Sequence, residues 1–208
     1  IQDIIASHHV QCAVYADDVQ LYVTFKPEDR DFAIKKVETC VDEIKIWCTA
    51  NKLVLNRSKT ELMHFTSKFT RNLDSCNIII GSPPIHPSPQ VRNLGIIMDS
   101  SLNMTSHVNS VCKSALYGIR QIGQIRQFLD QETTIRLVHA FVTSRLDSCN
   151  SLLYGLPEGE IRKLQRVQNV AARLVMKLPK RTHITPFLRQ LHWLPVRQRL
   201  EYKILIIT

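Results

Sequence analysis

The sequence has few of the features that mark disulfide-rich, zinc-binding or membrane-spanning proteins. Its six cysteines (12, 40, 48, 76, 112 and 149) form no CxxC pair, and with eight scattered histidines they give no zinc-finger spacing. No apolar run approaches the roughly 20 residues that a membrane-spanning helix needs, and no signal peptide is visible at the start. We therefore expect an intracellular protein, in nucleus or cytoplasm, with reduced thiols, no disulfide partner and no membrane segment.

Acidic residues are scarce in the second half of the chain. Residues 1–104 carry 11 Lys/Arg and 12 Asp/Glu, a net charge of −1, whereas residues 105–208 carry 16 and 6, a net charge of +10. This asymmetry predicts a polyanionic partner for the second half, and nucleic acid is the polyanion that a basic domain most commonly indicates. A basic surface that is merely solvated is the alternative.

Residues 10–25 predict a β-hairpin with two adjacent aspartates at its tip. The runs VQCAVY and VQLYVTF are rich in branched and aromatic residues, and they flank Asp17 and Asp18. Asp is common in turns because its side chain satisfies nearby backbone groups, so an acidic turn without further function is one interpretation. A metal site is the other, since Mg²⁺ prefers oxygen ligands and two-metal catalysis holds its ions about 3.5–4 Å apart.

The remainder of the first half predicts one long helix and several short strands. Pro27 and the acids after it indicate a helix start, and apolar residues then recur every three or four positions up to Cys48. Cys40 and Cys48 fall on one face of this helix, which favours packing over metal ligation. Residues 53–55 and 62–65 predict short strands, and residues 78–80 with 91–99 predict a second hairpin-like region interrupted by prolines.

The second half predicts helices. A long amphipathic helix begins with Thr105 or Ser106 as its cap, and a second helix includes residues 135–146. A third carries its apolar stripe over residues 161–175, with basic residues off that stripe, and a last helical segment follows Pro195.

Six segments in order resemble the reverse transcriptases of LINE-type (non-LTR) retrotransposons. They are YADDVQLYVTF, WCTANKLVLNRSKTELMHF, VRNLGIIMDSSLNMTSHV, FVTSRLDSCNSLLYGLP, KLQRVQNVAARLV and LRQLHWLPVRQRLEYKILIIT. The resemblance implies an α+β fold, with a partial polymerase palm over residues 1–104 (motifs C, D and E) and an all-helical, nucleic-acid-binding thumb over residues 105–208. It implies an RNA-directed DNA polymerase that uses Mg²⁺ for two-metal nucleotidyl transfer. A viral RNA-dependent RNA polymerase shares the palm, but the C-terminal segments resemble LINE sequence.

The Tyr-Ala-Asp-Asp box carries the roles that the resemblance implies for the catalytic site. Asp17 would be the principal metal-binding carboxylate and Asp18 its acidic neighbour, while Tyr15 and Ala16 would lie close to the primer terminus. Lys59, in the segment similar to motif D, would act on the leaving pyrophosphate, because a nearby cation stabilises developing negative charge. A solvated loop lysine is the alternative for Lys59.

The resemblance also implies contacts with a nucleic-acid duplex. Leu94 and Gly95 fall in the segment similar to motif E, the primer grip, where glycine allows close backbone approach; a glycine that relieves strand twist is the alternative. Five basic residues of the third helix are candidates for phosphate contacts: Arg162, Lys163, Arg166, Arg173 and Lys177. The implied partners are an RNA template, a DNA primer or RNA–DNA duplex, and deoxynucleotides.

The box lacks the partners that the family's chemistry needs. A further carboxylate comes from motif A, upstream of the box, and motif B lies between; only 14 residues precede Tyr15, and Asp3 is the sole acid among them. Both ends of the chain look cut from something longer. We therefore expect these 208 residues alone not to polymerise DNA. The alternatives are a non-catalytic nucleic-acid-binding module and a decayed or unexpressed transposon product.

Overall fold

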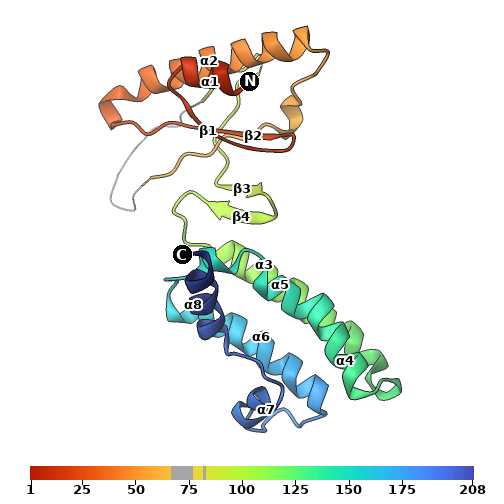
Figure 1. Ribbon diagram of the computed structural model, residues 1–208. Helices are drawn as coiled ribbons and strands as arrows, with labels where there is room; N and C mark the ends of the chain where they lie inside the picture. Colours follow the sequence, from red (N-terminus) through yellow and green to blue (C-terminus); the bar gives the residue numbers. More distant parts are fainter. Residues whose placement is uncertain (67–76, 82) are drawn as a thin grey trace. The chain divides into compact units, whose positions relative to one another are not determined.

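The computed structural model describes residues 1–66, 77–81 and 83–208 (Figure 1). The described chain is mixed α+β, as expected from the sequence, and its strands form two small antiparallel sheets of two strands each. It falls into two compact units, Ile1–Val91 and Arg92–Thr208. Among the described residues, no helix combines the length and the apolar character needed to cross a membrane.

The first unit pairs a hairpin with one long helix. Its elements are α1 (Gln2–Ser7), β1 (Gln11–Tyr15), β2 (Asp18–Tyr22), the 3₁₀ turn η1 (Pro27–Asp29), α2 (Arg30–Ala50) and the 3₁₀ turn η2 (Arg57–Lys59). β1 and β2 are antiparallel, with Gln11 opposite Tyr22 and Tyr15 opposite Asp18. The predicted hairpin and the predicted long helix are confirmed.

One face of α2 forms the core of this unit. Cys40, Ile44 and Cys48 are buried in a cluster with Ile5 and Val10. Burial, followed by the nearby Glu43 carboxylate, raises the pKa of the Cys40 thiol, so this side chain remains protonated near neutral pH. The predicted packing role of the helix cysteines is confirmed.

The short strands predicted after α2 are wrong. Residues 53–55 form no strand, and Val54 is 91% exposed, so no buried face holds the segment against a sheet. Leu62 and Ile78 make only isolated bridges, to Pro87 and Ile85. Proline has no backbone N–H to extend a ladder, which explains why these pairings stop after one bridge. The remainder of the proline-rich prediction, residues 67–76 and 82, lies outside the described residues.

The second unit is mainly helical. The 90–99 hairpin is formed by β3 (Gln90–Asn93), which straddles the boundary between the units, and β4 (Ile96–Asp99). The helical elements that follow are α3 (Thr105–Ile125), the 3₁₀ turn η3 (Arg126–Phe128), α4 (Gln131–Val138), the π-helical turn η4 (His139–Thr143), α5 (Ser144–Asp147), the 3₁₀ turn η5 (Asn150–Leu153), α6 (Glu158–Met176), α7 (Thr185–Gln190) and α8 (Val196–Ile207).

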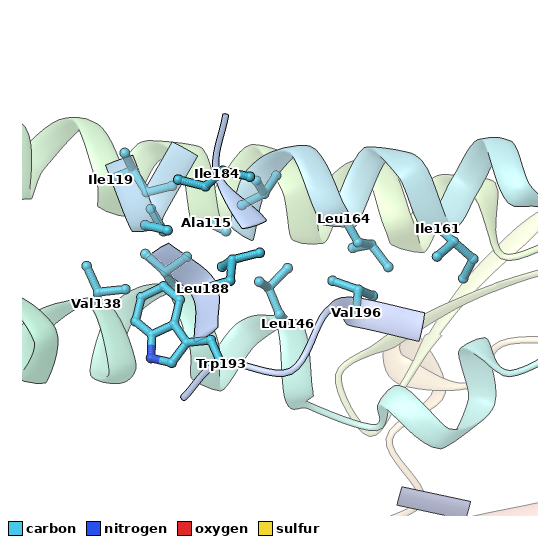
Figure 2. Close-up of a cluster of buried hydrophobic side chains, with 14 of the residues drawn as sticks. Ala115, Ile119, Val138, Leu146, Ile161, Leu164, Ile184, Leu188, Trp193 and Val196 are labelled. Carbon is cyan, nitrogen blue, oxygen red and sulfur yellow. The ribbon is translucent and has the colours of Figure 1, made fainter. Parts of the chain in front are cut away.

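A single apolar cluster holds these helices together. Val108, Val138 and Val142 are fully buried in it, and α3 packs along α6. Figure 2 shows Trp193, which follows α7, packed in this cluster with Leu188. Gly118 lets α3 approach η4 closely, because a Cβ atom there would lie 3.2 Å from the backbone oxygen of Phe141.

Asp99 joins the 90–99 hairpin to α3. Its Oδ1 accepts hydrogen bonds from the backbone N–H groups of Ser101 and Asn103, both at 3.1 Å, and from the Ser101 hydroxyl at 2.9 Å. Its Oδ2 accepts from the Met104 N–H at 2.9 Å. Burial alone would raise the pKa of Asp99, but these hydrogen bonds outweigh it and lower the pKa below its ordinary value.

This joint places residues 92–104 in the helical unit rather than with the N-terminal part, where the sequence analysis had grouped them. Met104 is buried in the helical core with a φ of +58°, and it directly precedes α3. The predicted cap at Thr105 or Ser106 is wrong: the side chains of Asp99 and Asn103 accept the hydrogen bonds at this end of the helix.

Among the described residues, four helices end in the same way without glycine. After α6, Leu178 N–H donates to the Arg173 carbonyl (3.0 Å) and Lys177 N–H donates to the Leu174 carbonyl (3.4 Å), which is the Schellman pattern. The residue that adopts the left-handed conformation has a φ between +51° and +57° in all four cases: His9, Lys52, Lys177 and His192. Glycine avoids the steric cost of this conformation, so each of these helix ends carries strain.

Replacing Asp99 by asparagine is expected to lower the stability of the helical unit by about 1–3 kcal/mol at pH 7. The pKa of Asp99 is lowered by folding, so its contribution is present above the unfolded value of about 3.9 and is lost as the pH falls through the folded value. Urea unfolding at several pH values should therefore show the gap between wild type and Asp99→Asn closing below about pH 4. The exposed Glu201, changed to glutamine, serves as control; a gap that is constant down to pH 3 would contradict the assignment.

Candidate functional site

The hairpin tip presents both aspartates to solvent. Ala16 and Asp17 form the two-residue loop between β1 and β2, and Asp18 is the first residue of β2. Ala16 has a φ of +53°, a conformation that costs a residue with a side chain about 1–3 kcal/mol. The ladder behind the tip fixes the chain, so the two carboxylates project from a stiff and strained turn.

The two faces of the hairpin differ. Cys12 and Leu21 are opposite each other and pack against the core with α2. Because side chains alternate along a strand, Tyr15 and Tyr22 lie on the other face, and they are 67% and 52% exposed. Tyr15 therefore offers a free aromatic ring beside the acidic tip.

The described residues supply the tip with no third metal ligand. No group of three or more His, Cys, Asp or Glu side chains that could hold a metal ion occurs among them. Asp3, the acid nearest upstream, is exposed on α1. Asp17 and Asp18 offer carboxylate oxygens, which hard cations prefer, and their metal-binding role stays a prediction.

Lys59 is not joined to this tip. It ends η2, where its N–H donates to the Asn56 carbonyl at 3.1 Å, and its side chain is exposed. In the part of the chain that the structure describes, no hydrogen bond or ion pair connects Lys59 with Asp17 or Asp18. Its predicted role on a leaving pyrophosphate stays a prediction.

Leu94 and Gly95 form the two-residue turn between β3 and β4. Their φ values are +45° and +85°, and a Cβ atom at Gly95 would meet nothing within 4 Å. Within the described chain, the glycine therefore serves the turn conformation rather than close packing, and the open space beside it faces outward. The primer-grip role of both residues stays a prediction.

The basic residues of α6 share one side of the helix. At about 100° per residue, Arg162, Arg166 and Arg173 fall within an arc of about 40° on α6, and Lys177 follows the last residue of this helix in the left-handed conformation. Arg162, Arg166 and Lys177 are exposed. Arg162 and Arg166 therefore lie one turn apart on the side of α6 away from the buried core, and Lys177 adds a third exposed cation just past the end of the helix. We call these four residues the α6 basic face.

The other two candidates on α6 have partners within the chain. Lys163 forms an ion pair with Glu160 at 2.9 Å and donates to the Asn109 side chain at 3.1 Å. Arg173 donates to the Thr182 carbonyl at 3.1 Å and is half-buried, although it lies on the basic face by position. Both side chains help to hold the fold, so the exposed cations are the stronger candidates for phosphate contacts.

The sequence analysis missed a second basic face on α3. Lys113, Tyr117 and Arg120 are exposed at steps of four and three residues, and Tyr117 is 63% exposed. Cations beside an exposed aromatic ring suit both phosphates and unpaired bases. The helical spacing of these three residues is the signal that could have revealed them.

The strained conformation after α6 allows a test of whether Lys177 contacts nucleic acid. Lys177→Gly and Lys52→Gly are each expected to raise the free energy of unfolding by about 1 kcal/mol, because both remove a side chain from the left-handed conformation. Only Lys177→Gly should weaken binding of an RNA–DNA duplex, by about threefold to fivefold. Denaturant unfolding and fluorescence anisotropy measure the two effects. Equal duplex affinity in both variants would exclude Lys177 from the interface.

The chain matches none of the protein-family models, curated proteins or solved structures with which it was compared. The resemblance to LINE-type reverse transcriptases therefore depends on the six sequence segments alone. The structural argument for function depends on two features, the acidic hairpin tip and the α6 basic face.

Proposed function

We propose that the chain is part of a LINE-type reverse transcriptase. In this proposal the 11–22 hairpin carries two of the metal-binding carboxylates, and the helical unit binds the nucleic acid. The observation that carries the proposal is the pair Asp17–Asp18 on an exposed, two-residue turn that holds Ala16 at a φ of +53°. Strained residues of this kind persist where the surrounding structure enforces them, and they cluster at functional sites.

The tip suits nucleotidyl transfer in its chemistry. Asp17 and Asp18 present carboxylate oxygens in water, where a hard divalent cation can be held by a few ligands together with substrate phosphates. Mg²⁺, when bound, would supply charge neutralisation to the phosphates of the reacting nucleotide. Tyr15, exposed beside the tip, offers a surface against which a primer or template base can stack.

The helical unit suits a polymerase that binds nucleic acid regardless of sequence. Arg162 and Arg166 lie on the side of α6 away from the core, and Lys177 is exposed just past the end of this helix. Contacts from such cations to phosphates carry no base information. An enzyme that copies any template needs this kind of contact. The net charge of +10 over residues 105–208 favours the same partner.

A non-catalytic nucleic-acid-binding module is the second candidate. It is favoured by the absence of a three-ligand metal group among the described residues. In that case the basic faces would act alone, and the acidic tip would be a turn without function. The two candidates differ in whether the tip holds a divalent cation better than an ordinary acidic surface.

Paramagnetic Mn²⁺ distinguishes the two candidates. In NMR spectra of the full chain, we expect Mn²⁺ to broaden the amide signals of residues 15–19 at a lower concentration than those of residues 28–31, by a factor of about five. The second segment is the control, because Glu28, Asp29 and Asp31 are also exposed acids close together, although Asp31 is paired with Arg30. Asp17 and Asp18 are adjacent on a two-residue turn held by the strand ladder, whereas the acids of residues 28–31 lie on η1 and the start of α2, where Arg30 already pairs with Asp31.

The double variant Asp17→Asn/Asp18→Asn should lose the broadening at the tip and keep it at residues 28–31. Broadening that appears at both segments together in the wild type would contradict a metal-binding role for the tip. The non-catalytic module would then be the better interpretation.

A further inference from the structure

Two neighbouring hollows open on the helical unit. The larger, about 700 Å³, is lined from α6, α7, the segment after α7 and the start of α8. The smaller, about 360 Å³, is lined from the α5–η5 region and α8. His192 and Leu194 line both, so the two hollows meet at the segment 191–195. Pockets that hold small ligands typically have volumes of about 300–1,000 Å³.

The larger hollow combines an apolar floor with amide groups. Leu188 and Trp193 are buried in the core below it, where Figure 2 shows them close together. Asn169 and Gln198 line it from α6 and α8, and their carboxamides each offer a donor and an acceptor. Carboxamides of this kind pair with the edges of nucleobases. No acidic side chain occurs among the described residues that line it.

The polar groups of this wall are held in place. Gln165 Nε2 donates to the Asn169 side chain at 2.8 Å, and Gln165 Oε1 accepts from the Val196 N–H at 2.8 Å. Gln168 Nε2 donates to the Leu194 carbonyl at 2.8 Å. These bonds fix α6 to the segment 191–196, so the hollow exists before any ligand enters.

Two cations, Lys203 and Arg199, line the smaller hollow. Lys203 and Tyr202 line it from the exposed side of α8, and His192 lines it from the shared segment. Its one acid, Asp147, forms an ion pair with Arg199, whose Nε donates to Oδ1 at 2.9 Å. The pairing neutralises the carboxylate, which leaves Lys203 as the uncompensated charge. A phosphate group suits such a site.

One buried acceptor in the smaller hollow has no partner. Asn150 is 4% exposed, and its Oδ1 accepts no hydrogen bond from the described residues, while its Nδ2 lies 3.4 Å from Asp147 Oδ1. Leaving a buried acceptor unsatisfied costs about 1–3 kcal/mol. Asn150 lines this hollow, but its Oδ1 is itself covered, so a hydroxyl group of a nucleotide sugar would satisfy it only after the side chain turns toward the hollow.

We propose that the two hollows form one nucleotide-binding groove. The base lies against Trp193 and the carboxamides in the larger hollow, and the phosphate lies by Lys203 and His192 in the smaller one. Arg189, exposed at the rim of the larger hollow, binds a second phosphate when the nucleotide belongs to a strand. The ligand is a single nucleotide unit, either free or within a single strand.

This groove is distinct from the proposed duplex interface. By helical position, Asn169 lies about 20° from Arg162 around α6, so the groove borders the α6 basic face without sharing its residues. A strand whose duplex part lies on the basic face could place an unpaired nucleotide in the groove. The groove can bind a nucleotide even if the basic face binds no duplex, and the two claims are tested by different variants.

Trp193 provides a local signal for binding. The chain has two tryptophans, and Trp47 belongs to the first unit, so the full chain carrying Trp47→Phe reports on the groove alone. Titration with hexauridylate should quench Trp193 emission. Arg189→Gln/Lys203→Gln should weaken this binding at least about tenfold, because two phosphate contacts are lost. Gln198→Leu, which keeps the size of the side chain but removes its amide, should weaken it about threefold or more.

The control variant is Lys180→Gln/Arg181→Gln. It removes two exposed cations that follow α6 and do not line either hollow, and it should change the affinity less than about twofold. Uridine monophosphate, added as a competitor of hexauridylate, then identifies the source of the nucleotide. If it displaces hexauridylate, the groove binds free nucleotides. If hexauridylate binds and is not displaced, the groove binds nucleotides within a strand.

Three results would contradict the proposal of a nucleotide-binding groove. The first is that hexauridylate does not quench Trp193 emission, and the second is that Arg189→Gln/Lys203→Gln and Lys180→Gln/Arg181→Gln weaken hexauridylate binding equally. The third is that hexaglutamate competes for the groove as strongly as unlabelled hexauridylate does. The last result would mean that only charge is recognised. Arg162→Gln/Arg166→Gln separates the two sites, since it should leave the quenching by hexauridylate within about twofold of the parent while weakening duplex binding.

Discussion

The helical unit depends on Arg126, a cation that serves the fold. Its guanidinium donates to the carbonyls of Leu174 and Val175, at 2.9 and 2.7 Å, and to the carbonyl of Leu129 at 2.8 Å. The first two carbonyls belong to the last turn of α6, where backbone acceptors lack helical partners and positive charge is favoured. Arg126 follows α3 directly and thereby joins the ends of the two helices that carry the exposed basic faces.

This arrangement explains how a strongly basic unit divides its charges. Some cations are held by the chain itself: Arg126 by carbonyls, and Lys163 and Arg199 by Glu160 and Asp147. Others, such as Arg162 and Arg166, are exposed on the side of α6 away from the core. Because α3 and α6 pack along each other in one cluster, the exposed cations keep fixed positions along their helices, which binding to a regular phosphate backbone requires.

The sequence predicted those features that depend on local patterns. The hairpin at 11–22 and the long helices follow from strand alternation and helical periodicity, and the tip acids from their place between two β-rich runs. The joint at Asp99 could not be predicted, because it depends on a side chain that bonds to backbone five residues away and on the burial of Met104. The sequence also did not predict that lysine and histidine adopt the left-handed conformation after four helices, because glycine is the residue expected at such positions.

In the candidate site, too, the sequence predicted some features, and others depend on tertiary contacts. Asp17 and Asp18 lie where the sequence placed them, at an exposed hairpin tip. Lys163 and Arg173 look equivalent to Arg162 in the sequence, but they are engaged with Asn109 on α3 and with Thr182 after α6. The groove at 191–195 had no sequence signal at all. It arises because Gln165 and Gln168 hold the segment after α7 against α6, which is a tertiary contact.

The salt dependence of RNA–DNA duplex binding tests the central claim, that the α6 basic face binds phosphates. The logarithm of the association constant should fall linearly with the logarithm of the salt concentration, and Arg162→Gln/Arg166→Gln should make the slope shallower by about 1.8, which corresponds to two lost phosphate contacts. Arg145→Gln/Arg181→Gln, which removes two exposed arginines outside this face, should leave the slope unchanged. An equal change of slope in both variants, or no change in either, would contradict the account.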